Sequence, residues 1–252
     1  MNTESLKEKA RQARIRVLEM IYKAQSSHLG SNFSCIDILT VMFEKADLSK
    51  DKIIVSKGWV AASVYYFLAD KGVIPTKDLE RFCGPDEEQY IGLLEPTVEG
   101  VHFAGGSMGY GLPAAVGFAL SKKMKGEGGT VYVLLSDGEV QIGTFWESML
   151  LAYQHKLDNL VVVVDNNGLQ AMGYTNEILA IKIPFHPIPV DGHNFEKLAE
   201  VLGEKEFGEP TVIDAITIKG KGVRYMEGEN LYHYKAPSKG EYEEALAELN
   251  QK

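Results

Sequence analysis

Apolar residues recur every three or four positions over residues 4–24, which predicts that the chain opens with a helix. A polar stretch from Gln25 to Ser34 follows, and a second helix is expected after it, through Phe43. Further helices are predicted over residues 60–71, 111–124, 144–156, 194–202 and 239–252. The segments between these helices hold the predicted strands.

Three continuous apolar runs, over residues 130–137, 160–167 and 210–217, are typical of strands that are buried on both faces. A shorter strand leads into a turn over residues 53–58, and residues 84–107 lack periodicity and are expected to form an irregular surface loop. Strands that alternate with helices predict an α/β fold with a doubly wound, mostly parallel sheet and helices on both faces. One domain is expected to span residues 1–252.

The overall charge and the two cysteines narrow the class of protein. A net charge of −9 argues against a nucleic-acid partner and against an anionic membrane surface. Cys35 and Cys83 form no paired motif, so we expect reduced thiols in a cytosolic protein. The first turns are charged, unlike a signal peptide, and no apolar run approaches the roughly 18 residues of a membrane span. A cytoplasmic location is therefore expected.

Candidate chemistry lies where two of the predicted strands end. Asp137 ends one apolar run and Asn167 the next, and a single strand–helix–strand crossover can bring them side by side. A carboxylate and an amide oxygen suit Mg²⁺ or Ca²⁺, and Mg²⁺ commonly completes its shell with phosphate oxygens. Either segment alone is an ordinary turn sequence, but the pair after two β-runs predicts a metal and diphosphate site.

The motifs around these two residues resemble those of the transketolase family. "SDGEVQIGTFWESMLLAYQHKLDNLVVVVDNNGLQ" resembles the family's thiamine diphosphate motif, in which GDG precedes an Asn-containing turn by about thirty residues. "SSHLGSNFS", "VSKGW", "GGSMGYGLPAAVGFAL", "IKGKGV" and "YHYKAPS" resemble further family elements. The resemblance covers essentially the whole chain but only the N-terminal half of a full-length transketolase. It implies the thiamine diphosphate-binding fold.

The resemblance also implies which residues hold the cofactor and the metal. Mg²⁺ (or Ca²⁺) would be bound by Asp137, Asn167 and the backbone carbonyl of Leu169. The other cofactor-binding positions, which contact the diphosphate or the two rings, are Trp59, Gly106, Ser107, Met108, Ser136, Gly138 and, again, Asn167. His28 and His233 match catalytic positions that face the donor and the diphosphate end of the cleft.

Four positions depart from the family pattern. Trp59 stands where the family has a histidine, Ser136 replaces the first glycine of GDG, and Ile142 replaces a glutamate of a network that links paired active sites. The family's G-H-P histidine has no counterpart in "YIGLLEPTVEGVHF", where His102 follows Gly100-Val101. The loss of two imidazoles and the gain of an indole make the cleft less cationic and more apolar, which weakens the expectation of an ordinary sugar-phosphate donor.

A transketolase also needs a glutamate from a second, pyrimidine-binding domain, and the resemblance does not extend to that domain. The resemblance therefore implies a separate C-terminal pyrimidine-domain subunit and an α2β2 heterotetramer. The expected activity is transfer of a two-carbon ketol unit from sugar or sugar-phosphate donors to aldehyde acceptors. Two alternatives stay open: a specialised thiamine-diphosphate-dependent C–C ligase or decarboxylase subunit, and a non-catalytic cofactor-binding homologue.

Overall fold

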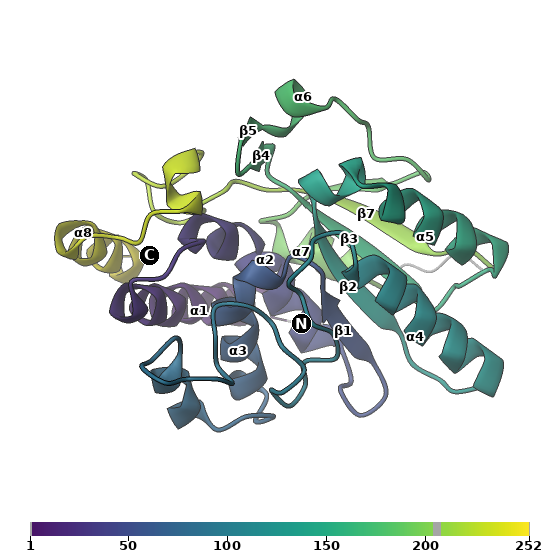
Figure 1. Ribbon diagram of the computed structural model, residues 1–252, viewed down its shortest axis with the longest axis horizontal. Helices are drawn as coiled ribbons and strands as arrows, with labels where there is room; N and C mark the ends of the chain where they lie inside the picture. Colours follow the sequence, from purple (N-terminus) through teal and green to yellow (C-terminus); the bar gives the residue numbers. More distant parts are fainter. Residues whose placement is uncertain (1, 204–207, 252) are drawn as a thin grey trace.

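Five parallel strands form the central sheet, in the order β1-β2-β3-β7-β6. The computed structural model, shown in Figure 1, describes residues 2–203 and 208–251. The strands of this sheet are β1 (Lys52–Val55), β2 (Val131–Ser136), β3 (Leu160–Asn166), β6 (Ile188–Asp191) and β7 (Thr211–Ile216). From β1 through β2 to β3, each new strand is added on the same side of the sheet. The chain then moves to the opposite edge, where it forms β6, and returns inward to form β7. The strand order therefore reverses between β3 and β7.

Helices cover both faces of this sheet (Figure 1). Side chains alternate along a strand, so Tyr132 and Leu134 pack in one apolar core while Val133 and Leu135 pack in the other. The first face carries α1 (Thr3–Ala24), α2 (Leu29–Lys45), α3 (Ala61–Asp70), α7 (Phe195–Val201) and α8 (Lys239–Asn250). The second carries α4 (Gly111–Lys125) and α5 (Gly143–Gln154). The predicted doubly wound parallel fold is confirmed.

The main helices and the four predicted strands are present, and their bounds differ from prediction by a few residues. One strand of the sheet was missed. β6 has four residues and contains Pro189, which fits an edge strand, and its pattern is too short to stand out in the sequence. The last residue of the predicted closing helix, 252, lies outside the described residues.

Several short elements also have no strong sequence signal. A two-stranded sheet of β4 (Leu169–Gln170) and β5 (Gly173–Tyr174) leads into the single-turn helix α6 (Thr175–Ile178) at the top of Figure 1. The 3-10 turns are η1 (Gly58–Val60), η2 (Thr76–Arg81), η3 (Asp137–Gln141) and η4 (Asn230–His233). Three of these turns, η1, η3 and η4, carry candidate site residues.

Two loop predictions need correction. The polar stretch through Ser34 is partly helical, because α2 begins at Leu29. In the helical part, Asn32 and Ser34 are buried and bonded: the amide oxygen of Asn32 accepts from the backbone N–H and the hydroxyl of Ser63, and the Ser34 hydroxyl donates to Asp165. Residues 84–107 contain no helix or strand, as predicted, but they are not only a surface loop. Tyr90 and Leu94 are buried in the first core.

The carboxyl ends of β1, β2, β3 and β7 lie together because all four strands are parallel. The segments that follow them carry Trp59, Asp137, Asn167 and Lys219, so residues far apart in the sequence meet at one edge of the sheet. Within the described ranges, no helix combines the length and the apolar character that crossing a membrane requires.

Candidate active site

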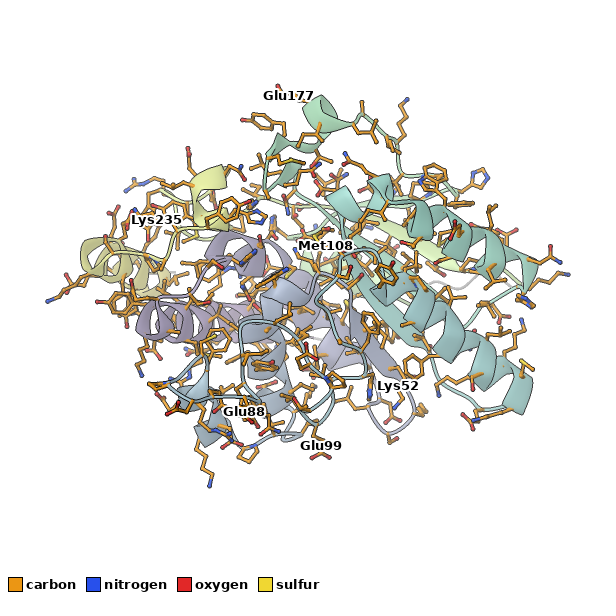
Figure 2. The ribbon with its side chains drawn as sticks, in the orientation of Figure 1. Lys52, Glu88, Glu99, Met108, Glu177 and Lys235 are labelled. Atoms are coloured by element: carbon orange, nitrogen blue, oxygen red, sulfur yellow. The ribbon has the colours of Figure 1, made fainter. Side chains whose placement is uncertain are left out.

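A cavity of about 560 Å³ lies at this edge of the sheet. It collects nine of the predicted site residues: His28, Trp59, Met108, Ser136, Asp137, Gly138, Asn167, Leu169 and His233. Gly106 and Ser107 are not among its lining residues, and both are exposed. Figure 2 shows Met108 near the centre of the molecule, whereas Glu88 and Glu99 of the preceding loop lie at its lower edge.

Asp137 and Asn167, the predicted metal ligands, both line this cavity. Oδ1 of Asp137 accepts from Gly138 N–H at 2.8 Å, and Oδ2 accepts from Gly168 N–H at 2.7 Å. Oδ1 of Asn167 accepts from Leu169 N–H at 3.1 Å. Burial, with the nearby Asp165 carboxylate, raises the pKa of Asp137 to about 6. A bound cation would offset that burial and favour the charged carboxylate.

The donor chemistry at this point suits one hard cation held jointly by protein and phosphate. Within residues 2–203 and 208–251, no group of three or more His, Cys, Asp or Glu side chains is arranged to hold a metal. The predicted site needs no such group, because it combines one carboxylate with an amide oxygen, a backbone carbonyl and diphosphate oxygens. The residues present therefore fit a magnesium ion bound together with a diphosphate.

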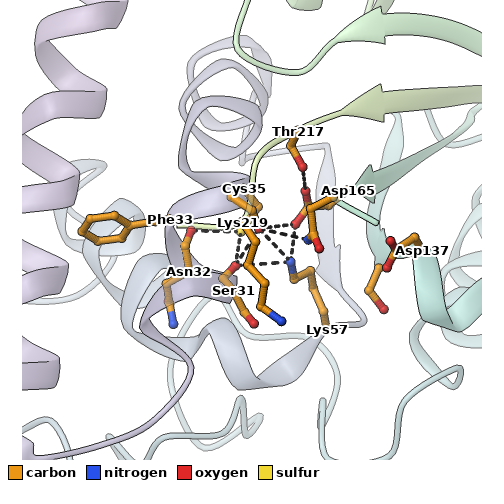
Figure 3. A network of polar contacts seen from close by, with 12 residues as sticks. Ser31, Asn32, Phe33, Cys35, Lys57, Asp137, Asp165, Thr217 and Lys219 are labelled. Carbon is orange, nitrogen blue, oxygen red and sulfur yellow. Dashed lines mark hydrogen bonds and ion pairs between the residues drawn. The ribbon is translucent and has the colours of Figure 1, made fainter. Parts of the chain in front are cut away.

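A buried ion pair, drawn in Figure 3, joins Lys57, which lines the cavity, to Asp165. Lys57 donates to Asp165, and both side chains are almost fully buried. Asp165 also accepts from Ser34 at 2.6 Å and from the hydroxyl of Thr217. Burial opposes the charge on Lys57, but the charge and hydrogen bond of Asp165, together with the nearby Cys35 and Asp137, outweigh burial and raise the pKa of Lys57. The network joins the ends of β1, β3 and β7 to α2.

The two candidate histidines lie in contact with each other, and His28 also contacts Trp59. The rings of His28 and Trp59 stack with centroids 4.9 Å apart, and those of His28 and His233 meet edge to face at 4.8 Å. Burial, followed by the charge of Lys219, lowers the pKa of His28 to about 4 and that of His233 to about 3. Both imidazoles are therefore neutral near pH 7.

Lys219 stands behind His233. Its Nζ lies 2.7 Å from His233 Nδ1 and donates to Asn230 Oδ1 at 3.2 Å. Burial, together with the charge of Lys57, lowers the pKa of Lys219 to about 8. An ammonium has only donors, so His233 Nδ1 accepts and the neutral ring carries its proton on Nε2.

A second buried carboxylate holds the loops around the cavity. Glu139 accepts from the Ser56 hydroxyl, from Gly109 N–H at 2.8 Å and from Ser136 N–H at 2.8 Å. These groups follow β1, precede α4 and end β2. Glu139 therefore fixes the segment that carries Met108 against the strand ends.

The residues that depart from the family pattern do not all lie at the candidate site. Trp59 and Ile142 line the cavity, as do Ile178 and Leu179, so part of its lining is apolar. His102 lines a different, largely apolar cavity of about 270 Å³. It therefore does not replace the missing histidine at the candidate site.

Lys57, Asp165 and Lys219 were missed as functional candidates from sequence. Each lies within a motif that the sequence displays, "VSKGW", "VVVVDNNG" or "IKGKGV". A buried lysine looks like an exposed one in a single sequence. The available signal was that each charged residue lies at or within three residues of the carboxyl end of a predicted strand.

Comparisons with known proteins agree with this geometry. A family model for the transketolase thiamine diphosphate binding domain matches residues 5–249. One subunit of the apulose-4-phosphate transketolase of Phocaeicola vulgatus is 30% identical, over 100% of this chain and 96% of its own length. The 6-deoxy-6-sulfo-D-fructose transketolase subunit of a Clostridium species is 30% identical, over 97% of this chain and 96% of its length.

The solved transketolases are longer than this chain. The crystal structure of the Campylobacter jejuni enzyme superposes with a TM-score of 0.91 at 28% identity, and covers 99% of this chain. This chain spans 43% of that protein. The chain belongs to the transketolase family, as a thiamine diphosphate-binding domain.

Proposed function

We propose that this chain is the cofactor-binding subunit of a two-component transketolase that moves a two-carbon ketol unit from a ketose or related carbonyl donor to an aldehyde. The observation that carries the proposal is the meeting of Asp137, Asn167, His28 and His233 in one cavity at the strand ends. Relatives of matching length are named as transketolase subunits rather than as whole transketolases. The retained pair of Asp137 and Asn167 argues against a purely degenerate homologue.

Thiamine diphosphate, when bound, supplies the carbanion chemistry that C–C bond cleavage and formation require. Asp137, Asn167 and the Leu169 carbonyl would hold Mg²⁺, with Ca²⁺ as a substitute, and Gly138 would allow the diphosphate to approach. The chain's own catalytic groups are the neutral imidazoles of His28 and His233. A neutral ring with Nε2–H, as in His233, can donate to a substrate oxygen or to a phosphate without adding charge.

The partner in this proposal is a pyrimidine-domain subunit that supplies the activating glutamate, and the assembly is α2β2. Apolar side chains are exposed on two segments that contribute residues to the cavity: Met172, Tyr174 and Leu179 on the segment that follows β3, and Leu231 and Tyr234 in and directly after η4. Burying such side chains against a second subunit would be favourable. The free cysteines Cys35 and Cys83 support a reducing compartment, and we therefore propose the cytoplasm.

The purified chain alone is expected to bind Mg²⁺ and thiamine diphosphate weakly and to show no ketol transfer. Adding the matching pyrimidine-domain subunit should produce both stable association and turnover, measured by coupled assay with ketose phosphates and α-keto acids. The His233→Ala variant in the same complex is the control. Turnover by this chain without the second subunit would contradict the two-component proposal.

A specialised C–C ligase or decarboxylase acting on a less polar donor is the second candidate. Trp59 favours it, since its side chain is 42% exposed and lines the cavity next to His28. An indole offers one donor and a broad apolar face in place of the family's imidazole.

The Trp59→His variant is expected to shift donor preference toward ketose phosphates by about tenfold in relative kcat/KM, with little change in melting temperature. The cause is the gain of a polar partner for the donor and the loss of apolar contact. Measuring kcat/KM for one ketose phosphate and one less polar donor in both proteins tests this. An equal change for both donors would show that Trp59 is a packing residue. Trp59→Phe, which keeps an apolar ring, serves as the control.

A further inference from the structure

A buried cluster on the first face of the sheet joins three separate elements. It consists of Arg14 of α1, Asp37 of α2 and His193 of the turn between β6 and α7, here called the Asp37 cluster. Arg14 donates to Asp37 through both terminal nitrogens, at 2.7 and 2.9 Å. His193 Nδ1 lies 2.7 Å from Asp37 Oδ2. All three side chains are largely withdrawn from solvent.

The protonation of this cluster follows from its contacts. Burial alone would raise the pKa of Asp37, but the charge of Arg14 and the hydrogen bond from His193 outweigh burial and lower it. His193 Nδ1 therefore faces a carboxylate and donates its proton. Nε2 of the same ring accepts from Ile218 N–H at 2.9 Å. Both ring nitrogens are thus engaged, so His193 is suited to hold structure rather than to bind a ligand.

The cluster holds residues 217–222, the segment after β7, at two points. His193 accepts from Ile218 N–H, and Arg14 Nε donates to the Lys221 carbonyl at 2.8 Å. Between them, Gly220 has a φ of +79° and donates to the Gly30 carbonyl at 3.0 Å. A side chain on Gly220 would meet the Met226 carbonyl oxygen at 2.3 Å. The path of the chain on both sides of Lys219 is therefore fixed.

Lys219 connects this segment to the candidate active site. Its side chain is 1% exposed, and its Nζ lies 2.7 Å from Nδ1 of His233. The position of the Lys219 ammonium selects the tautomer of His233, with the proton on Nε2. A shift of the 217–222 segment would move the ammonium away from the ring. His233 could then adopt the other tautomer or turn within the cavity.

We propose that Arg14, Asp37 and His193 are positioning residues that act through Ile218 and Lys219 to set the tautomer and orientation of His233. The structural part of this proposal concerns this chain alone. Its effect on turnover rests on the proposed function. The contact that a substitution can test most directly is the hydrogen bond from Ile218 N–H to His193 Nε2. A single change of the His193 side chain can remove this bond without breaking the ion pair of Arg14 with Asp37.

Two substitutions at His193 separate the two bonds of the ring. His193→Asn keeps a donor for Asp37 at the position of Nδ1 but cannot reach Ile218. His193→Gln places an amide oxygen near the position of Nε2, where it can accept from Ile218 N–H. The first is expected to disturb His233, and the second to preserve it.

The direct measurement is the ¹⁵N NMR spectrum of the full chain with labelled histidine. The six histidines give a small set of ring signals, and His233→Ala identifies those of His233. The wild type and His193→Gln should show His233 protonated on Nε2. His193→Asn and Lys219→Met should show a mixture of tautomers. The exposed His155 is the internal reference, since its signals should not change.

The kinetic measurement uses the complex with the pyrimidine-domain subunit. His193→Asn should lower kcat about tenfold and leave KM within about twofold, as a small displacement of a catalytic group does. His193→Gln should restore most of kcat. If the complex showed no ketol transfer with any donor, the proposed function would fail, but the NMR result would still decide the positioning role.

Unchanged His233 signals in His193→Asn would overturn the proposal. So would an equal loss of kcat in the Asn and Gln variants, because a purely structural role would lower the melting temperature of both without changing the tautomer of His233.

Discussion

Replacing Lys57 with Met is expected to lower the free energy of unfolding by about 3–5 kcal/mol. Asp165 is 0% exposed and would keep a buried charge without its cation. Its remaining bonds, from Ser34 and the Thr217 hydroxyl, come from neutral donors and do not compensate a full charge. Urea unfolding of the purified chain, followed by circular dichroism, measures the change. Lys71→Met, which removes an ion pair nearer the surface, is the control and should change stability by less than about 1 kcal/mol.

The double variant Lys57→Met/Asp165→Asn distinguishes the effect of the unpaired charge on stability from the effect of lost packing around the lysine. Asn keeps an acceptor for Thr217 and removes the buried charge, so the double variant should regain more than half of the stability lost. A double variant as unstable as Lys57→Met would show that the lysine stem, and not the unpaired carboxylate, causes the loss. Full stability in Lys57→Met alone would contradict the ion-pair argument.

The strands of the sheet were predictable from sequence where a run of apolar residues marks them clearly. The runs that became β2 and β3 are apolar at nearly every position, because both faces of each strand lie in a core. β6 is the opposite case. Its four residues include a proline and pair only with β7, so the neighbouring strand defines β6 more than its own pattern does. The short β4–β5 pair has no periodicity to detect.

The site was predictable as a set of positions, and its internal bonds were not. Asp137 and Asn167 follow their strands in sequence, so the topology alone brings them together. Lys57 and Asp165 are 108 residues apart, and nothing in a single sequence indicates that these two charged side chains are buried and form an ion pair. The tautomer of His233 depends on Lys219, and Lys219 lies in a segment that is held by Arg14 and His193. Such dependence on tertiary contacts has no local sequence signature.

Met108 and its neighbours show the limit of transferring positions by motif. Met108 lines the cavity, but the adjacent Gly106 and Ser107 do not, although all three stand in one matching segment. A motif fixes which residues are adjacent in sequence and leaves open which of them faces the cavity. The bond from Gly109 N–H to Glu139 holds the segment in the observed position. Contact of Gly106 and Ser107 with a bound cofactor therefore stays a prediction.

Replacing Asp137 with Asn or Ala is expected to weaken binding of thiamine diphosphate in the assembled enzyme by at least about 100-fold, or about 2.7 kcal/mol. Asp137 is the single carboxylate of the proposed ligand set, and without it the diphosphate charge and the metal lose their common partner.

Without cofactor and metal, the same substitution should leave the stability of the protein unchanged or raise it. Burial raises the pKa of Asp137 to about 6, so its charge is unfavourable until a cation binds. Asp137→Asn keeps the size and an acceptor for Gly168 N–H, and its melting temperature without cofactor should match or exceed that of the wild type. Loss of binding without loss of stability would separate the role of Asp137 as a ligand from a role in folding.

The decisive measurement is the cofactor affinity with and without metal, by calorimetry on the complex in Mg²⁺, in Ca²⁺ and in a chelator. In the wild type the metal should strengthen cofactor binding strongly, whereas in both Asp137 variants the affinity should be nearly the same in all three conditions, because the site that couples metal to diphosphate is gone. Glu177→Ala, which removes an exposed carboxylate at the top of the view in Figure 2, is the matched control and should keep the metal effect. If Asp137→Ala bound thiamine diphosphate with unchanged affinity and unchanged metal dependence, the metal would have to be held elsewhere. The assignment of Asp137 and Asn167 as its ligands would then be wrong.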